Sequence, residues 1–342
     1  MMIYTNKYFS TFTSGFESTI EELLERSLRG AKIEILLDGL IVYSTDSSIE
    51  EIKRVKFFTN SFLLLRFFPK TENINIEKMM SSVLNDRTRF NAKLPNNVKT
   101  FRVIASKENQ HVPVNTRLML NMENLISRNF HLRPNRSNPQ IQFWFLTRSE
   151  GYGFFGMRLT KHQDYADILQ KGELRPELTD ILCLLSEPQK SDIFLDPFAG
   201  SGAIPFARIK ISPFSHIFIG DIDQVKVDQL KFKVGRRDEI MVGKWDATKL
   251  EDFENESVNK IVTDPPWGYF GNSGIDLNKL YTEMLNSFYR VLKNNGIGVI
   301  LVGDRSFFEN ILAKFTHEFR IEKKLYVLVS GKKAGVYKIE KI

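Results

Sequence analysis

The segment Ile193-Phe-Leu-Asp-Pro-Phe-Ala-Gly-Ser-Gly202 decides the fold. Its first three residues are apolar and predict a short buried strand, and residues 203–209 are predicted to follow as a helix interrupted early by Pro205. A strand, a glycine turn and a helix in this order are typical of the nucleotide or nucleoside loop of doubly wound α/β proteins. The sequence therefore predicts a mostly parallel sheet with a ligand loop at the carboxyl end of its first strand.

The residue types of this loop restrict the ligand. Gly200 and Gly202 allow a ligand to approach the backbone closely, while Asp196 places a carboxylate at the end of the strand. A diphosphate prefers amides and cations, so this acid suits a ligand with a cationic amino acid end. Pro205 stands where a nicotinamide-binding loop has its third glycine, and this disfavours a dehydrogenase.

Two more strands of the region end in acidic residues. Asp221 follows a strand about twenty residues beyond the glycines, where a carboxylate can hold ribose hydroxyls, and Asp223 is expected to cap the next helix, although the two roles are interchangeable. Asp246 follows the third strand and either accepts from an adenine amino group or caps a helix. Acids at three successive strand ends predict a nucleoside site.

The fourth strand runs into Asp264-Pro-Pro-Trp267. The exocyclic amine of a nucleobase is a poor nucleophile because its lone pair is delocalised into the ring. Asp264 and the carbonyl of Pro265 can each accept an N–H bond from such an amine, while Pro265 and Pro266 fix the backbone. Trp267 offers a surface on which an extruded base stacks. Alone the tetrapeptide could be a turn with a core tryptophan, but behind the glycine loop it favours alkylation of an amino group.

Alternating helices and short strands surround these motifs from Leu174 onward and predict a parallel sheet covered on both faces, closed by an antiparallel edge hairpin. The expected strands are residues 193–195, 216–219, 240–242, 260–263 and 297–302, followed by the hairpin of 319–330 and 335–339. The first 70 residues have a β-α-β-β-α-β order with a hairpin turn at Asp38-Gly39, which is typical of a ferredoxin-like domain.

A second unit, residues 71–160, is expected to open with residues 76–84 and to contain a strand at 100–106, a helix at 115–127 and two strands at 140–147 and 152–159. The net charge of the chain is +7, and basic residues concentrate between Arg87 and Lys161. This stretch contains thirteen basic and three acidic residues, so its local net charge is +10. Such a charge indicates a polyanion partner. A solvated surface of a basic protein is the alternative. The thirteen are Arg87, Arg89, Lys93, Lys99, Arg102, Lys107, Arg117, Arg128, Arg133, Arg136, Arg148, Arg158 and Lys161.

Composition argues against several other classes of protein. The sequence has no apolar run of about 18 residues and no cationic start followed by an apolar stretch, so we expect a protein of the cytoplasm without a membrane segment. Cys183 is the single cysteine and lies in an apolar helical pattern, which favours a core position. The five histidines are scattered without metal-ligand spacing, so we expect no metal site.

The chain resembles the S-adenosylmethionine-dependent RNA guanine-N2-methyltransferases that carry a THUMP domain. The resemblance rests on residues 196–202, on Asp264 to Trp267, and on Leu174-Arg-Pro176 upstream of the loop; the turn at residues 13–17 and the stretch 101–159 resemble the amino-terminal half of the family more weakly. It implies a ferredoxin-like domain (1–70), a THUMP domain (71–160), a linker (161–175) and a Rossmann-like methyltransferase domain (176–342). One departure is His162-Gln-Asp-Tyr165, where relatives often have a more basic segment.

The resemblance also implies roles for individual residues. Asp264, Pro265, Pro266 and Trp267 would be catalytic, acting on the N2 amine of a guanosine in the acceptor region of tRNA. S-adenosylmethionine would be held by Leu174, Pro176, Asp196, Phe198, Gly200, Gly202, Asp221, Asp223 and Asp246. The tRNA acceptor end would be bound by Arg102, Lys107, Arg117, Arg128, Arg133 and Arg136. We expect a monomer or weak homodimer; rRNA guanine-N2 methylation, DNA adenine-N6 methylation and a non-catalytic RNA-binding module are the alternatives.

Overall fold

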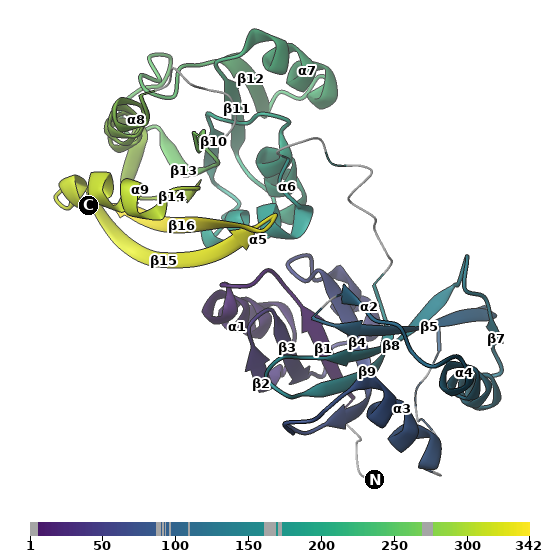
Figure 1. Cartoon of the computed structure of the whole chain (residues 1–342). Coiled ribbons are helices and arrows are strands. Elements are labelled where there is room, and N and C mark those ends of the chain that lie inside the picture. Colours follow the sequence, from purple (N-terminus) through teal and green to yellow (C-terminus); the bar gives the residue numbers. More distant parts are fainter. Residues whose placement is uncertain are drawn as a thin grey trace. The chain divides into compact units, whose positions relative to one another are not determined.

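A computed structural model describes residues 6–86, 90, 92, 94–95, 97–108, 110–160, 169, 173–268 and 276–342. The chain divides into two compact units, the first of residues up to 11 with 24–163 and the second of residues 12–23 with 164–342 (Figure 1). Most of the expected linker, including His162 to Tyr165, lies outside the described residues, as do Arg87, Arg89, Lys93 and Lys161 of the basic stretch.

One mixed sheet runs through the described part of the first unit, in the order β2-β3-β1-β4-β9-β8-β5-β6, with β7 paired to β5. In chain order the elements up to residue 158 are β1 (Lys7–Thr11), α1 (Glu17–Ser27), β2 (Lys32–Leu37), β3 (Leu40–Ser44), α2 (Ile49–Arg54), β4 (Asn60–Phe68), α3 (Ile76–Asn85), β5 (Thr100–Lys107), β6 (Gln110–His111), α4 (Thr116–Phe130), β7 (Arg133–Pro134), β8 (Ile141–Thr147) and β9 (Gly153–Arg158). The larger part of α1, up to residue 23, belongs to the second unit.

Local signals in the first unit produce the elements that they predict. The hairpin of β2 and β3 turns at Asp38-Gly39, where Gly39 has a φ of 74°, and Ser48 forms a capping box with Glu51 at the start of α2. The β-α-β-β-α-β order of the first 70 residues is confirmed. Strand β4 also pairs with β9, so the sheet continues from the ferredoxin-like part into the following segment. A domain boundary at residue 70 stays a prediction.

The second unit contains a seven-stranded sheet of order β12-β11-β10-β13-β14-β16-β15. Strands β10 to β14 run parallel, and β16 and β15 close the edge as an antiparallel hairpin, which confirms the expected Rossmann-like architecture. Its elements are α5 (Pro176–Leu185), β10 (Ile193–Asp196), α6 (Ala203–Ile211), β11 (His216–Asp221), α7 (Gln224–Val234), β12 (Ile240–Lys244), β13 (Val258–Thr263), α8 (Leu277–Val291), β14 (Leu292–Val302), α9 (Arg305–Leu312), the 3-10 turn Ala313–Phe315, β15 (Phe319–Val329) and β16 (Lys332–Lys341).

Helices cover both faces of this sheet, with α8 and α9 on one side and α5 and α6 on the other (Figure 1). From β10 the chain first adds β11 and β12 on one side of the sheet and then crosses to add β13 and β14 on the other side. In open α/β sheets, ligands bind outside the carboxyl ends of the strands at such a reversal of strand order. The fold therefore places a candidate site where Asp196, Asp221 and Asp264 follow their strands.

The helix α6 differs from the expectation. Pro205 is its third residue, and the helix continues unbroken to Ile211, so the predicted interruption is wrong. A proline in the first turn removes an N–H that has no intrahelical partner in any case, which is why the helix tolerates it. Gly202 precedes the helix with a φ of 91°, a left-handed conformation that favours glycine.

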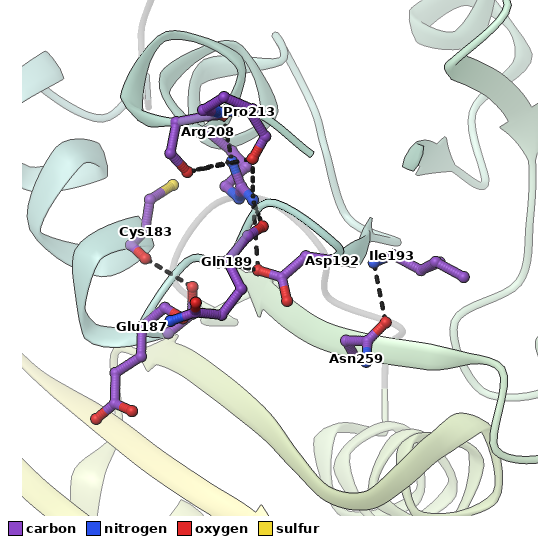
Figure 2. Close-up of polar contacts among 10 residues, drawn as sticks. Cys183, Glu187, Gln189, Asp192, Ile193, Arg208, Pro213 and Asn259 are labelled. Atoms are coloured by element: carbon purple, nitrogen blue, oxygen red, sulfur yellow. Dashed lines mark hydrogen bonds and ion pairs between the residues drawn. The ribbon is translucent and has the colours of Figure 1, made fainter. Parts of the chain in front are cut away.

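A buried arginine of α6 joins this helix to the segment that precedes β10 (Figure 2). The Arg208 guanidinium is fully buried and donates to the carbonyl oxygens of Gln189 and Ser212 and to the Asp192 carboxylate, at 2.9 to 3.3 Å. Nearby, the thiol of Cys183 is buried 3.4 Å from the Ile204 carbonyl oxygen, and burial raises the pKa of this thiol. Cys183 is a core residue, as its sequence pattern predicts.

Candidate active site

A cavity of about 670 Å³ opens at the carboxyl ends of β10, β11, β12 and β13. It brings together residues that are far apart in the sequence, because parallel strands present their carboxyl ends at one edge of the sheet. Of the predicted site residues, those that line it are Leu174, Phe198, Gly200, Asp221, Asp223, Asp246, Asp264 and Pro266. The cavity therefore joins the predicted ligand loop to the Asp-Pro-Pro-Trp segment.

Asp196 is fully buried and does not itself line the cavity. Its Oδ1 accepts hydrogen bonds from the Thr263 hydroxyl at 2.7 Å and from the Phe198 amide at 3.2 Å, whereas Oδ2 is buried with no hydrogen-bond partner among the described residues. Burial raises the pKa of Asp196 to about 8, and the two hydrogen bonds oppose that shift. A buried carboxylate with an unpaired oxygen fits a cationic ligand group that would favour its charged form.

Asp221 ties the glycine loop to the end of β11. Its Oδ2 accepts the amide of Gly200 at 3.0 Å, its Oδ1 accepts the amide of Asp223 at 3.0 Å, and the ammonium group of Lys226 lies 3.4 Å from Oδ2. Each carboxylate oxygen can accept more than one hydrogen bond, so Asp221 retains capacity for ligand hydroxyls. The side chain of Asp223 accepts the Val225 amide at 2.9 Å and caps α7, as expected.

Asp246 caps a turn and lines the cavity at the same time. Its Oδ1 accepts the amide and the hydroxyl of Thr248, at 2.9 and 2.6 Å. Both interpretations of this residue are thus compatible, since Oδ1 holds the turn while the residue also lines the cavity. The hydrogen bonds of Asp246 to Thr248 support the capping role.

Trp245 is a cavity residue that the sequence motifs miss. Gly220 and Gly243 are direct partners across β11 and β12, and a Cβ atom at either position would lie within 2.4 to 2.6 Å of the Trp245 ring. The indole therefore lies against both strand ends because neither partner has a side chain. Two glycines at the ends of neighbouring predicted strands were the signal that could have revealed it.

The indole of Trp267 points its N–H at Asp264. Nε1 donates to Oδ1 of Asp264 at 2.7 Å, and burial raises the pKa of this carboxyl to about 7 despite that hydrogen bond. The hydroxyl of Tyr281 donates to the Pro266 carbonyl oxygen at 2.7 Å, which holds the diproline segment from α8. Trp267 is half-buried, and its ring packs against Gly303 at the end of β14.

Several predicted residues lie outside the cavity lining. Gly202 precedes α6, Pro176 begins α5, and Pro265 is buried. A Cβ atom at Gly202 would lie 2.4 Å from the Phe206 ring, so this glycine permits close packing of the loop on its own helix. Glu173 lines the mouth beside Leu174 and accepts a 3.0 Å hydrogen bond from the Ser201 hydroxyl, a contact that the sequence did not indicate.

The predicted RNA-binding residues lie in the first unit. Lys107, Arg117, Arg128 and Arg133 are exposed, and Arg117 and Arg128 lie eleven residues apart, on one face of α4. Arg102 is half-buried. Arg136 forms a bidentate ion pair of 2.9 to 3.0 Å with the buried Glu123, which raises the pKa of this arginine and gives it a structural contact as well.

Over the described residues, no helix is long and apolar enough to cross a membrane. Within the same residues, no three histidine, cysteine or acidic side chains are grouped so that they could hold a metal ion.

Parts of the chain are similar in sequence to known methyltransferases. Residues 214–333 match the model of the RMKL-like methyltransferase domain family. A segment of 185 residues is 28% identical to the tRNA (guanine(6)-N(2))-methyltransferase THUMP3 of Mus musculus and covers 49% of this chain and 36% of that protein. A segment of 206 residues is 22% identical to the tRNA (guanine(6)-N2)-methyltransferase of Methanocaldococcus jannaschii, covering 48% of this chain and 53% of that one.

The fold is shared over nearly the whole chain with TrmN from Thermus thermophilus. The TM-score is 0.77 at 21% sequence identity, and the match covers 98% of this chain and 100% of TrmN. The chain spans only about a third to a half of the length of these two curated relatives. Residues 214–333 are thus similar to a methyltransferase domain, and the fold of the chain is that of TrmN.

Proposed function

We propose that the protein transfers a methyl group from S-adenosylmethionine to the exocyclic N2 amine of a guanosine in the acceptor region of tRNA. The observation that carries the proposal is that one cavity is lined both by residues of the glycine loop and by Asp264. A donor bound on the loop and an amine held by Asp264 would meet inside it. The donor supplies a methyl group on a sulfonium, which is electrophilic.

The donor would be held by three carboxylates in three different settings. Asp196 supplies the unpaired buried oxygen that suits the cationic amino acid end, and Asp221 has remaining acceptor capacity for the ribose hydroxyls. Asp246 has one oxygen left for an adenine amino group, and the Trp245 ring lines the cavity beside it. This is the set of acceptors that a nucleoside with an amino acid tail requires.

Asp264 would act on the nucleobase. Its carboxylate accepts an N–H bond of the amine, which draws the nitrogen lone pair toward the methyl group, and the Pro265 carbonyl provides a second acceptor. With a pKa of about 7, Asp264 is also placed to take up the proton that the amine loses. Trp267 both orients Asp264 through its N–H and offers its ring to the base.

The first unit supports RNA as the substrate. The exposed face of α4 contains Arg117, Asn121, Asn124 and Arg128, and no acidic residue, because Glu123 is turned inward and buried. Cationic and amide side chains on one helix face suit the phosphates and sugars of a structured RNA. The two curated relatives are named for guanine N2 of tRNA, which supports that base and that RNA here.

Incubation of the full chain with radiolabelled donor and, separately, with tRNA, rRNA and DNA tests this proposal. We expect label in tRNA and none in DNA. Label in rRNA guanine or in DNA adenine would show that the substrate is a different nucleic acid, while the proposed methylation of an exocyclic amine would stand. Calorimetry that shows no affinity for S-adenosylmethionine would leave a non-catalytic RNA-binding module and would refute the proposal.

A further inference from the structure

A second cavity, of about 600 Å³, lies where β14 leads into α9. It is lined by Gly303, Asp304, Arg305, Ser306, Lys332 and Lys333, which we call the cationic cavity. Three of these side chains carry a positive charge. Asp304 is its acidic lining residue, and Oδ1 of this carboxylate accepts the Phe307 amide at 3.0 Å as the cap of α9. The lining therefore has a net charge of about +2.

The cationic cavity adjoins the catalytic segment through Gly303. A Cβ atom at this position would lie 2.7 Å from the ring of Trp267, so one residue touches the tryptophan and lines the cavity. The register of the sheet explains why the lysines are also here. Val302 at the end of β14 pairs with Gly335, and Lys332 begins the same strand, β16, so Lys332 and Lys333 lie at the edge to which β13 delivers Asp264.

Arg305 is oriented by an aromatic ring. Its guanidinium carbon lies 4.6 Å from the centroid of the Tyr326 ring, and the Tyr326 hydroxyl donates to the Glu309 carboxylate at 2.9 Å. Stacking engages the face of a guanidinium, whereas phosphate is bound through the N–H groups of its edge. The arrangement thus fixes the side chain and leaves it suited to a phosphate.

Resting on the function proposed above, we infer that the cationic cavity binds a backbone phosphate of the RNA strand next to the guanosine that is methylated. A nucleotide that leaves the base stack stays attached to the phosphates on either side of it, and these must lie close to the pocket that receives the base. Arg305 and the two lysines offer the matching charge in the cavity that Gly303 lines, and Gly303 touches Trp267. Their charge selects a polyanion and provides no means of reading the base.

The salt dependence of tRNA binding tests this inference in the full chain. Arg305→Gln and Lys333→Gln each remove one charge, and Lys314→Gln, at an exposed position beyond the far end of α9, is the matched control. We expect each cavity variant to weaken tRNA binding by roughly threefold to tenfold and to lower the slope of log K against log salt by about 1. Donor affinity and the Lys314→Gln variant should match the wild type.

The possible results separate the two proposals. If the wild type methylates tRNA while the cavity variants keep its affinity and its salt slope, this inference is wrong and the proposed function stands. If the wild type neither binds nor methylates tRNA, both fall. Ethylation of tRNA phosphates gives a second readout: interference beside the methylated guanosine should appear with the wild type and weaken with Lys333→Gln. Equal interference with both proteins would overturn the inference.

Discussion

The Trp267 indole donates a 2.7 Å hydrogen bond to the Asp264 carboxylate, so the aromatic residue and the acid of the Asp-Pro-Pro-Trp segment form one unit. The same carboxyl group has its pKa raised to about 7 by burial. Positioning of the acid and contact with the base are therefore coupled, and substitutions at the two residues can separate them.

Replacement of Asp264 should remove methyl transfer without affecting the donor. Asp264→Ala leaves the amine without its acceptor, and we expect the rate to fall by about a thousandfold or more. Donor affinity, measured by calorimetry, should stay within about twofold, because Asp196 and Asp221 are unchanged. An Asp264→Ala variant with full turnover would show that this residue is not catalytic.

The rate should depend on pH through the ionisation of Asp264. Because the charged form is the acceptor, kcat should rise about tenfold per pH unit below 7 and level off above it. Asp264→Asn keeps an amide oxygen as acceptor but cannot titrate, so its rate should be lower and flat over the same range. A wild-type profile without this rise between pH 5 and 7 would contradict the role of the carboxylate.

Trp267→Phe separates the hydrogen bond of the tryptophan from its ring. The indole N–H lowers the pKa of Asp264, so its loss should move the rise in kcat to higher pH. Trp267→Leu should in addition weaken nucleobase binding, since stacking on an aromatic ring contributes about 1 to 3 kcal/mol per base. An unshifted profile for Trp267→Phe, together with full activity of Trp267→Leu, would count against both roles.

Asp196→Asn tests the donor site and has an expected effect on stability. The variant keeps the shape but loses the charge, so donor affinity should fall by about tenfold to a hundredfold. The pKa of Asp196 is about 8 in the folded protein and 3.8 as its ordinary value, so the folded state keeps the proton as pH rises. Its contribution to stability is therefore complete below about pH 4 and is lost as pH rises through 8.

Without donor, the thermal midpoint of the wild type should consequently fall between pH 6 and pH 9 more than that of Asp196→Asn. Scanning calorimetry of both proteins at the two pH values measures this difference. Parallel curves would mean that Asp196 is ionised in the folded protein without a ligand. The donor affinity of the variant is a separate readout and decides the binding role independently.

The elements that local signals specify could be predicted from the sequence. The Asp38-Gly39 turn and the glycine loop after β10 each depend on a few neighbouring residues. The start of β14 could not be found in this way. Asn294, Asn295 and Gly296 are turn-forming residues, so the strand was expected from Ile297, yet it begins at Leu292 and pairs there with Val258. Tertiary pairing outweighs local preference at this point.

Site residues that come directly after predicted strands could be predicted from the sequence. Site residues whose position depends on how neighbouring strands are paired could not. Asp221 and Asp264 end predicted strands, and the parallel sheet brings them together. Trp245 occupies its place because Gly220 and Gly243 are partners, which requires the register of β11 and β12. The ion pair of Arg136 with the buried Glu123 likewise depends on a loop returning to α4, which charge counting does not reveal.

Analysis of the methylated nucleoside tests the central claim most directly. Unmodified tRNA is incubated with the full chain and labelled donor, digested to nucleosides and examined by mass spectrometry, with Asp264→Ala as control. The account predicts N2-methylguanosine from the wild type and none from the variant. Label found in another nucleoside, or equal N2-methylguanosine from both proteins, would contradict it.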